Sequence, residues 1–286
     1  MTPCQSYTLN ADEYHSGLTR SFSRVDIVSV FIYSIAPIPS SVIPTRVRHD
    51  YSPGVDDADV LLGTGDSGPR SRRAGPATAI VVDGRAYLVD VGPGVIRRAA
   101  AAHEKGIAAL DPVNLTHAFV TQLQFAHTGG YPDLVFTPSL LGRKPPLEVY
   151  GPAGIRTLTD HVLAAWNERA QVNAHEVTPG LVYRDDKITV IAFSGGYRLQ
   201  TADRKIVIAG EASPAQTVVG QCNGCDVLIR EVQIDAVRQL SELATRARPE
   251  LLILHRKGTA SEEQLARMIG SVYRGRFIIG HDLDVY

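Results

Sequence analysis

The chain has 286 residues, 44% of them hydrophobic, which is enough to bury one large core or two small ones. Its 29 Lys and Arg residues nearly balance its 30 Asp and Glu residues. No net basic charge is present to hold a nucleic-acid backbone, which argues against a nuclease, although net charge says nothing about a local basic patch. Three cysteines are too few for a disulfide scaffold.

Residues 1–57 differ from the rest of the chain. They are rich in Ser, Pro and Thr and follow neither a helical nor a strand period. The apolar run 27–36 is shorter than the roughly 20 residues that span a bilayer, so we expect no stable membrane anchor. We interpret the segment as a non-catalytic extension, for which an export leader, a packed strand and a poorly ordered tail all stay open. Residues 58–286 are assigned to one domain, and a cytoplasmic location is preferred to export.

From residue 58 onward, strands occur in runs with helices between them, in two similar halves. The pair Asp83-Gly84 predicts a tight hairpin between strands 78–82 and 86–89. Further strands are predicted at 60–62, 116–121, 147–150, 188–193, 197–201, 205–209, 227–229, 251–254 and 276–279. Helices are predicted at 96–105, 155–167, 234–246 and 261–271. This order favours an α/β fold in which two mixed β-sheets pack face to face with helices outside, an αββα sandwich.

The segment Cys222-Asn-Gly-Cys225 has the C-x-x-C spacing of a redox or zinc-binding pair. A zinc site would need a second pair, and a redox site would need a thioredoxin-like context. An Asn-Gly turn flanked by small apolar residues explains the same four-residue segment without a zinc site or a redox site. The turn is the preferred interpretation.

Several short motifs follow one another in a characteristic order. They are Leu61-Leu62-Gly63-Thr64-Gly65, Leu88-Val89-Asp90-Val91-Gly92, His127-Thr128-Gly129-Gly130, Val149-Tyr150-Gly151-Pro152 and Gly196-Tyr197-Arg198. With this order and spacing, residues 59–286 resemble the metallo-β-lactamase superfamily, in the branch of ribonuclease Z and its arylsulfatase-like relatives. The resemblance implies the αββα fold and a hydrolytic site in which two zinc ions activate a bridging water. It also implies that Asp90 supports the loop beside the metals.

The metal motif of the resembled family, Thr-His-x-His-x-Asp-His, is altered here. Gln122 and Gln124 stand at its two first histidines, Ala126 at its aspartate, and His127 matches its last histidine. Further along, Glu211 stands at the bridging aspartate, Arg230-Glu231 at a His-Glu pair, and His255 matches the final histidine. A glutamine amide is a weak zinc ligand compared with imidazole, and alanine cannot bind a metal at all. We therefore expect a degenerate site without the two-zinc centre.

The donors that the resemblance leaves are His127, Glu211 and His255. Two histidines and a carboxylate hold zinc or iron in other proteins, so these residues predict at most one transition metal, Zn or Fe, or none. Each also has a structural interpretation: His127 bonded to a loop carbonyl, His255 as a core histidine and Glu211 paired with an arginine.

The favoured hypothesis is a diverged enzyme that acts on a small organic molecule with one metal or none. The alternatives are a catalytically inactive ligand-binding protein and an ordinary metal-dependent hydrolase with replacement ligands. We expect a small-molecule partner and no nucleic acid, and allow a homodimer. Trp166 is expected in the core. The candidate catalytic residues are His127, Glu211 and Arg230, and the candidate substrate-binding residues are Gln122, Gln124 and Glu231.

Overall fold

The computed structural model describes residues 57–65, 68, 73–256 and 261–286. The chain divides into two units, Met1–Ile38 and Pro39–Tyr286, and all described residues belong to the second. The expected extension 1–57 therefore lies outside the described residues, apart from its last position, and its interpretation stays a prediction. Within the described ranges, no helix combines the length and apolar character needed to span a bilayer.

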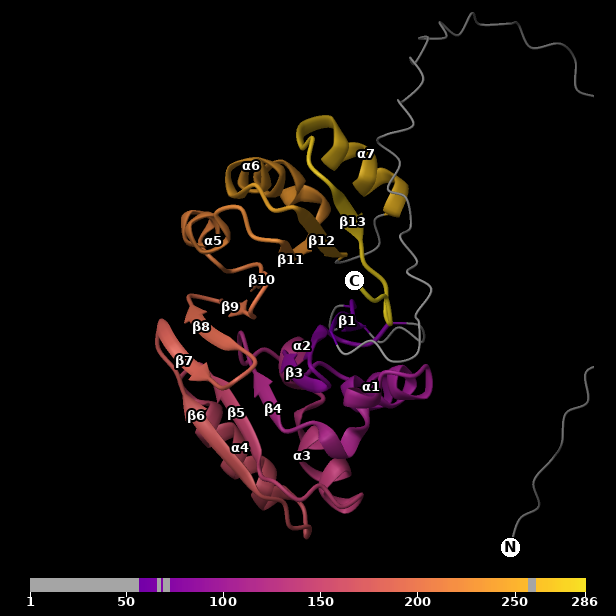
Figure 1. Cartoon of the computed structure of the whole chain (residues 1–286), viewed down its shortest axis with the longest axis vertical. Helices are drawn as coiled ribbons and strands as arrows, with labels where there is room; N and C mark the ends of the chain where they lie inside the picture. Colours follow the sequence, from indigo (N-terminus) through magenta and orange to yellow (C-terminus); the bar gives the residue numbers. More distant parts are fainter. Residues whose placement is uncertain (1–56, 66–67, 69–72, 257–260) are drawn as a thin grey trace, which may run out of the picture. The chain divides into compact units, whose positions relative to one another are not determined.

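Two mixed β-sheets form the centre of the unit Pro39–Tyr286 (Figure 1). In each sheet, antiparallel strands occupy one side and parallel strands the other. The first sheet has the order β1-β2-β3-β4-β5-β6: Ala58–Gly63, Ala77–Val82, Arg85–Val89, His117–Phe119, Leu147–Gly151 and Val172–Glu176. The second has the order β13-β12-β11-β10-β9-β8-β7: Phe277–Ile279, Leu251–Arg256, Val227–Val232, Lys205–Ala209, Gly196–Gln200, Thr189–Phe193 and Gly180–Arg184.

Helices cover the outer faces of both sheets (Figure 1). Period-two alternation explains the layering, since neighbouring strand residues point to opposite faces. In β2, Ala79 and Val81 pack with the helices, whereas Ile80 and Val82 pack between the sheets. The predicted αββα sandwich is thus confirmed. The first sheet carries α1 Val95–Glu104, α3 Tyr131–Leu140 and α4 Ile155–Ala165; the second carries α5 Ala215–Cys222, α6 Val237–Ala247 and α7 Glu262–Val272.

Two strands and three helices were not predicted from the sequence. The strands β6 and β7 lie at sheet edges, where their side chains are exposed or half-buried. β6 shows no apolar run, and the run in β7 is only three residues long. The helix α3 contains Pro138, a residue that usually ends a helical pattern. The helix α5 and the single turn α2, Phe125–Thr128, are short.

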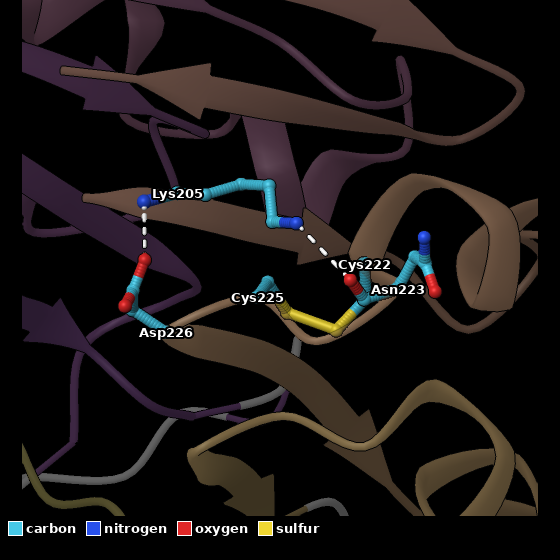
Figure 2. Close-up of a disulfide and its surroundings, with 5 residues drawn as sticks. All are labelled: Lys205, Cys222, Asn223, Cys225 and Asp226. Atoms are coloured by element: carbon cyan, nitrogen blue, oxygen red, sulfur yellow. Dashed lines mark hydrogen bonds between the residues drawn. A yellow bond between two sulfur atoms is a disulfide. The ribbon is translucent and has the colours of Figure 1, made fainter. Parts of the chain in front are cut away.

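A turn of Asn223 and Gly224 connects α5 to β11. Both residues have positive φ, 38° and 72°, which Asn and Gly tolerate best, so the predicted Asn-Gly turn is confirmed. The sulfur atoms of Cys222 and Cys225 are also bonded to each other (Figure 2), which the preferred interpretation left out. Both cysteines are fully buried, and Cys222 lies at the C-terminal end of its helix, where the helix dipole disfavours a thiolate. The disulfide is therefore a structural link.

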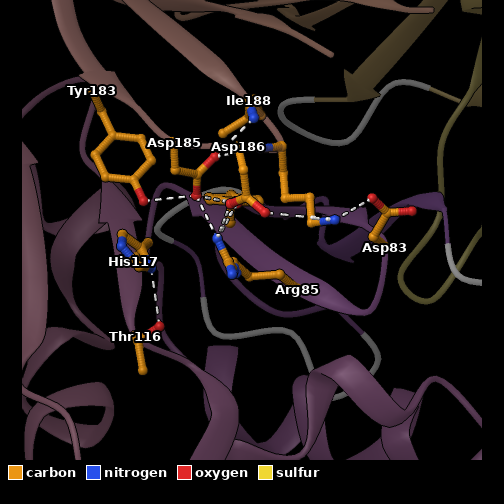
Figure 3. Close-up of polar contacts among 10 residues, drawn as sticks. Asp83, Arg85, Thr116, His117, Tyr183, Asp185, Asp186 and Ile188 are labelled. Atoms are coloured by element: carbon orange, nitrogen blue, oxygen red, sulfur yellow. Dashed lines mark hydrogen bonds and ion pairs between the residues drawn. The ribbon is translucent and has the colours of Figure 1, made fainter. Parts of the chain in front are cut away.

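Asp185, in the turn between β7 and β8, joins the two sheets. Its carboxylate accepts hydrogen bonds from the hydroxyls of Tyr87 at 2.6 Å and Tyr183 at 2.8 Å, and pairs with Arg85 at 2.7 Å (Figure 3). Tyr87 and Arg85 belong to β3 of the first sheet. At this end of the sandwich, one carboxylate thus connects the two sheets.

Candidate active site

A small pocket lies between the two sheets, where β3, β10, β11 and β12 end. Its volume is about 20 Å³, room for one water-sized group. The strands β11 and β12 run parallel, with Glu231 opposite His255, so these two side chains enter the pocket at the same level. Thr78, Asp90, His127 and Arg230 complete its polar lining.

Asp90 organises the wall contributed by the first sheet. It follows β3 with φ 61°, a left-handed conformation that an aspartate tolerates better than most residues. Its carboxylate accepts hydrogen bonds from the backbone N–H of Thr121 at 2.8 Å and from the Thr121 hydroxyl at 2.9 Å. The third partner is His127, whose Nδ1 lies 2.9 Å from Asp90 Oδ2. This agrees with the supporting role that the resemblance implies for Asp90.

Both ring nitrogens of His127 are engaged. A carboxylate can only accept, so the Nδ1 that faces Asp90 carries the proton in the neutral imidazole. The lone pair then lies on Nε2, which is 2.6 Å from the side-chain nitrogen of Gln122. The amide N–H of Gln122 donates to this lone pair, the same one that a metal would use. Glu231 Oε1 lies 3.4 Å from the same nitrogen.

The wall contributed by the second sheet carries a neutral histidine and a cation. His255 is 5% exposed, and its Nε2 has no hydrogen-bond partner among the described residues. Burial lowers the pKa of His255 to about 3, with further lowering by Arg73 and His127, so the imidazole is uncharged near neutral pH. Arg230 donates from Nη2 to the carbonyls of Glu211 and Ser213, both at 3.3 Å, and burial lowers its pKa.

The pocket brings together four of the seven predicted site residues, a fifth is bonded to one of these four, and two lie outside. Glu211 is exposed, and its carboxylate accepts a hydrogen bond from Gln233 at 2.9 Å. Gln124 is exposed at the start of α2. The structure therefore does not place Glu211 in the pocket with His127 and His255, and the single-metal set stays a prediction. No motif marks Arg73, whose charge acts on His255. Inside the pocket are His127, Arg230, Glu231 and His255, with Gln122 bonded to His127.

Two zinc ions do not fit the donors that this pocket presents. The Nε2 lone pair of His127 accepts from Gln122, and Ala126 has no donor atom. Arg230 brings a positive charge into the lining, which opposes binding of a second cation. In the part of the chain that the structure describes, no three His, Cys, Asp or Glu side chains are grouped so that they could hold a metal ion.

Comparisons with known proteins place the chain in one family. No protein-family model matches it. The ribonuclease Z of Mycobacterium sp. (strain KMS) is 33% identical over 214 residues, which are 66% of this chain and 72% of that protein. The metallo-β-lactamase fold protein YhfI from Bacillus subtilis superposes with a TM-score of 0.67 at 16% identity, covering 80% of this chain and 98% of YhfI. The short form of human tRNase Z gives a TM-score of 0.65 at 22% identity, over 80% and 98% of the two chains.

The expectation of a small-molecule partner and no nucleic acid is wrong, because the relatives found by sequence are ribonucleases. Its physical basis was the balanced net charge, which averages over the whole surface and misses where cations gather. A chain that is 33% identical to a ribonuclease Z and covers 72% of its length belongs to the ribonuclease Z family, and its fold is that of the metallo-β-lactamases.

Proposed function

We propose that this protein acts on RNA, that the pocket between its sheets meets an RNA phosphate, and that it does so without a pair of zinc ions. The observation that carries the RNA substrate is the 33% identity to a ribonuclease Z over 72% of that protein. The hydrogen bond from Gln122 to His127 supports the absence of the zinc pair, because it occupies the ligand atom.

The chemistry of the lining supports the following roles for its polar groups. Arg230 is the cation of the pocket, and its Nη1 is buried without a partner among the described residues. A guanidinium suits phosphate oxygens because its N–H groups are fixed in a fork. A space for one water-sized group admits a single phosphate oxygen at its mouth rather than a whole phosphate. Asp90 and Gln122 hold His127 in one tautomer at the wall.

This arrangement favours binding over hydrolysis. In the resembled centre, paired zinc ions supply hydroxide at neutral pH and stabilise the developing charge. Losing a single group that stabilises a transition state costs roughly 10²–10³-fold in rate. We therefore expect phosphodiester cleavage at or near background while RNA binding persists.

The test uses the full chain and a precursor-tRNA transcript with a 3′ extension. Binding is measured by fluorescence anisotropy and cleavage by gel, each with added zinc and with a chelator. We expect binding that is unchanged by chelator, weakened by Arg230→Gln and retained by Arg238→Gln, a control arginine on the exposed face of α6. Absence of RNA binding by the wild type would overturn the proposal.

A second candidate function is zinc-dependent RNA hydrolysis with replacement ligands. The observation that favours it is that His127, Glu231 and His255 line one pocket. As described, these side chains are not grouped to hold a metal ion, so zinc binding would have to draw them together. Chelator-sensitive cleavage that zinc restores would establish it in place of the function proposed above.

A further inference from the structure

A groove lies on the first half of the domain, away from the pocket. It is bounded by the end of α3, the loop before β5 and the segment from α4 to β6, and we call it the α3–α4 groove. Its volume is about 520 Å³, within the range of ligand sites. The strands β3 to β6 are parallel, so the groove lies at their amino ends and the pocket at their carboxyl ends.

The groove carries positive charge that nothing nearby neutralises fully. Arg143, Lys144 and Arg169 line it, against one acidic residue, Glu168. Lys144 and Arg169 are exposed, and neither forms an ion pair with any residue of the described ranges. Both charges therefore face solvent.

Arg143 is a buried cation at the base of this groove. It is 9% exposed and donates to the backbone carbonyls of Leu115, Leu134 and Val135 at 3.0–3.2 Å. No carboxylate of the described residues pairs with it. Burial lowers its pKa to about 10, so it is still charged near neutral pH. A buried charge without a counter-ion is costly unless an anion approaches.

Trp166 lies in sequence between Leu163 and Glu168, two residues that line the groove. It is 50% exposed, which corrects the expectation that it belongs to the core. It is the C-cap of α4, and its ring lies 5.4 Å from the ring of Phe136 on α3, so it reaches across the helices that bound the groove. Proteins bind single-stranded nucleic acid with two kinds of side chain placed next to each other. Cationic side chains bind the phosphates, and an exposed aromatic ring stacks on a base.

We propose that the α3–α4 groove binds a single-stranded segment of RNA, with Lys144 and Arg169 at its phosphates and Trp166 stacked on a base. This proposal rests on the RNA-directed function proposed above and adds a second contact, remote from the pocket.

The chain contains one tryptophan, so its tryptophan emission reports on Trp166 alone. The precursor-tRNA transcript is titrated into the full chain between 50 and 200 mM salt, and tryptophan emission is recorded beside anisotropy. We expect quenching of Trp166 with the Kd that anisotropy gives. The double variant Lys144→Gln/Arg169→Gln should bind roughly tenfold or more weakly at 50 mM salt, with the slope of log K against log salt reduced by about 1.5.

Two further variants make the test specific. Lys105→Gln/Arg267→Gln neutralises an exposed lysine at the end of α1 and an exposed arginine on α7, and should bind like the wild type. Trp166→Ala should weaken binding without changing the salt slope, since stacking releases no counterions.

Three outcomes would overturn the proposal that the α3–α4 groove binds RNA. Equal losses in both double variants would mean diffuse attraction between charges. If the wild type binds RNA, the variant Lys144→Gln/Arg169→Gln binds it with the same affinity and Trp166 is not quenched, then the groove is not an RNA site. The proposed function would remain intact. If no RNA binds but a poly-glutamate peptide quenches Trp166, the groove serves an acidic protein partner.

Discussion

At the scale of single residues, one hydrogen bond decides what the pocket can hold. The sequence predicts that the polar side chains of Gln122 and His127 lie near each other, but it does not predict their geometry. The structure places the Gln122 amide nitrogen 2.6 Å from His127 Nε2, on the lone pair that a metal would need. Glu211 shows the opposite case, because its sequence position matches a ligand while its side chain is exposed and bonded to Gln233. Alignment to a motif predicts a position along the chain, and side-chain direction depends on loop geometry.

Zinc content tests this account of the pocket. We predict at most one metal equivalent per chain for the wild type, because Gln122 and Gln124 replace two histidine ligands of the resembled motif and Ala126 replaces its aspartate. The triple variant Gln122→His/Gln124→His/Ala126→Asp should bind at least one more equivalent, since imidazole and carboxylate are strong zinc ligands. Elemental analysis of protein purified without chelator measures both values. Two equivalents in the wild type would contradict the prediction, and so would a triple variant that binds no additional metal.

Asp59 carries a pH-dependent contribution to stability. It is fully buried in β1, paired with Arg204, and burial raises its pKa to about 6 against the partial opposition of Arg204. Between its ordinary pKa of 3.8 and about 6, the folded protein binds a proton that the unfolded chain lacks. The contribution is therefore complete below pH 3.8 and is lost as the pH rises through 6.

We predict that Asp59→Asn removes this dependence. Relative to the variant, the wild type should gain up to about 3 kcal/mol in free energy of unfolding as the pH falls from 7.5 to about 4. Urea unfolding at several pH values measures the difference. Asp203→Asn, at an exposed carboxylate, should keep the wild-type slope. Parallel stability curves for the wild type and Asp59→Asn would contradict the assignment.

At the scale of elements, local turn chemistry was more predictive than strand patterning. Asp83 and Gly84 adopt φ of 44° and 72°, the positive pair of a tight hairpin, and β2 and β3 pair across them as expected. Asn223 and Gly224 make the second predicted turn. The edge strand β6 was missed because it has few apolar residues and pairs with β5 across a helix, and β7 was missed because its apolar run is only three residues long.

The link between α5 and β11 offers a test at this scale. The disulfide leaves Cys4 as the one cysteine outside it, so denatured wild-type protein should present a single titratable thiol. A bond that closes so short a loop stabilises by roughly 2 kcal/mol. We predict that Cys222→Ala/Cys225→Ala lowers the free energy of unfolding by at least this amount, since it also removes buried side chains, and that Cys4→Ala keeps the bond. Three free thiols in non-reduced protein would show that the bond is absent.

At the scale of the whole molecule, the sequence predicted the architecture better than the chemistry. The two-sheet sandwich follows from the order of many short motifs, each of which tolerates substitution as long as strands and turns persist. Substrate class depends instead on where a few charges meet on the surface. Arg143, Lys144 and Arg169 come from two separate segments, so net charge could not reveal that they line one groove.

The contacts of Asp185 with both sheets lead to a prediction about the stability of the whole fold. Three side chains from both sheets donate to this carboxylate, as do the backbone N–H groups of Lys187 and Ile188 at 2.8 Å. Asp185→Asn keeps the shape but turns an acceptor into a donor facing donors, so we expect a loss of about 2–4 kcal/mol in the free energy of unfolding. The neighbouring Asp186 is 66% exposed with one partner within 3.1 Å, and Asp186→Asn should change stability by less than about 0.5 kcal/mol. Chemical denaturation of both variants measures the contrast. None of the side chains of this cluster lines the pocket or the α3–α4 groove, so Asp185→Asn should retain wild-type RNA affinity under folding conditions. Equal stabilities of the two variants would show that other contacts hold the sheets together.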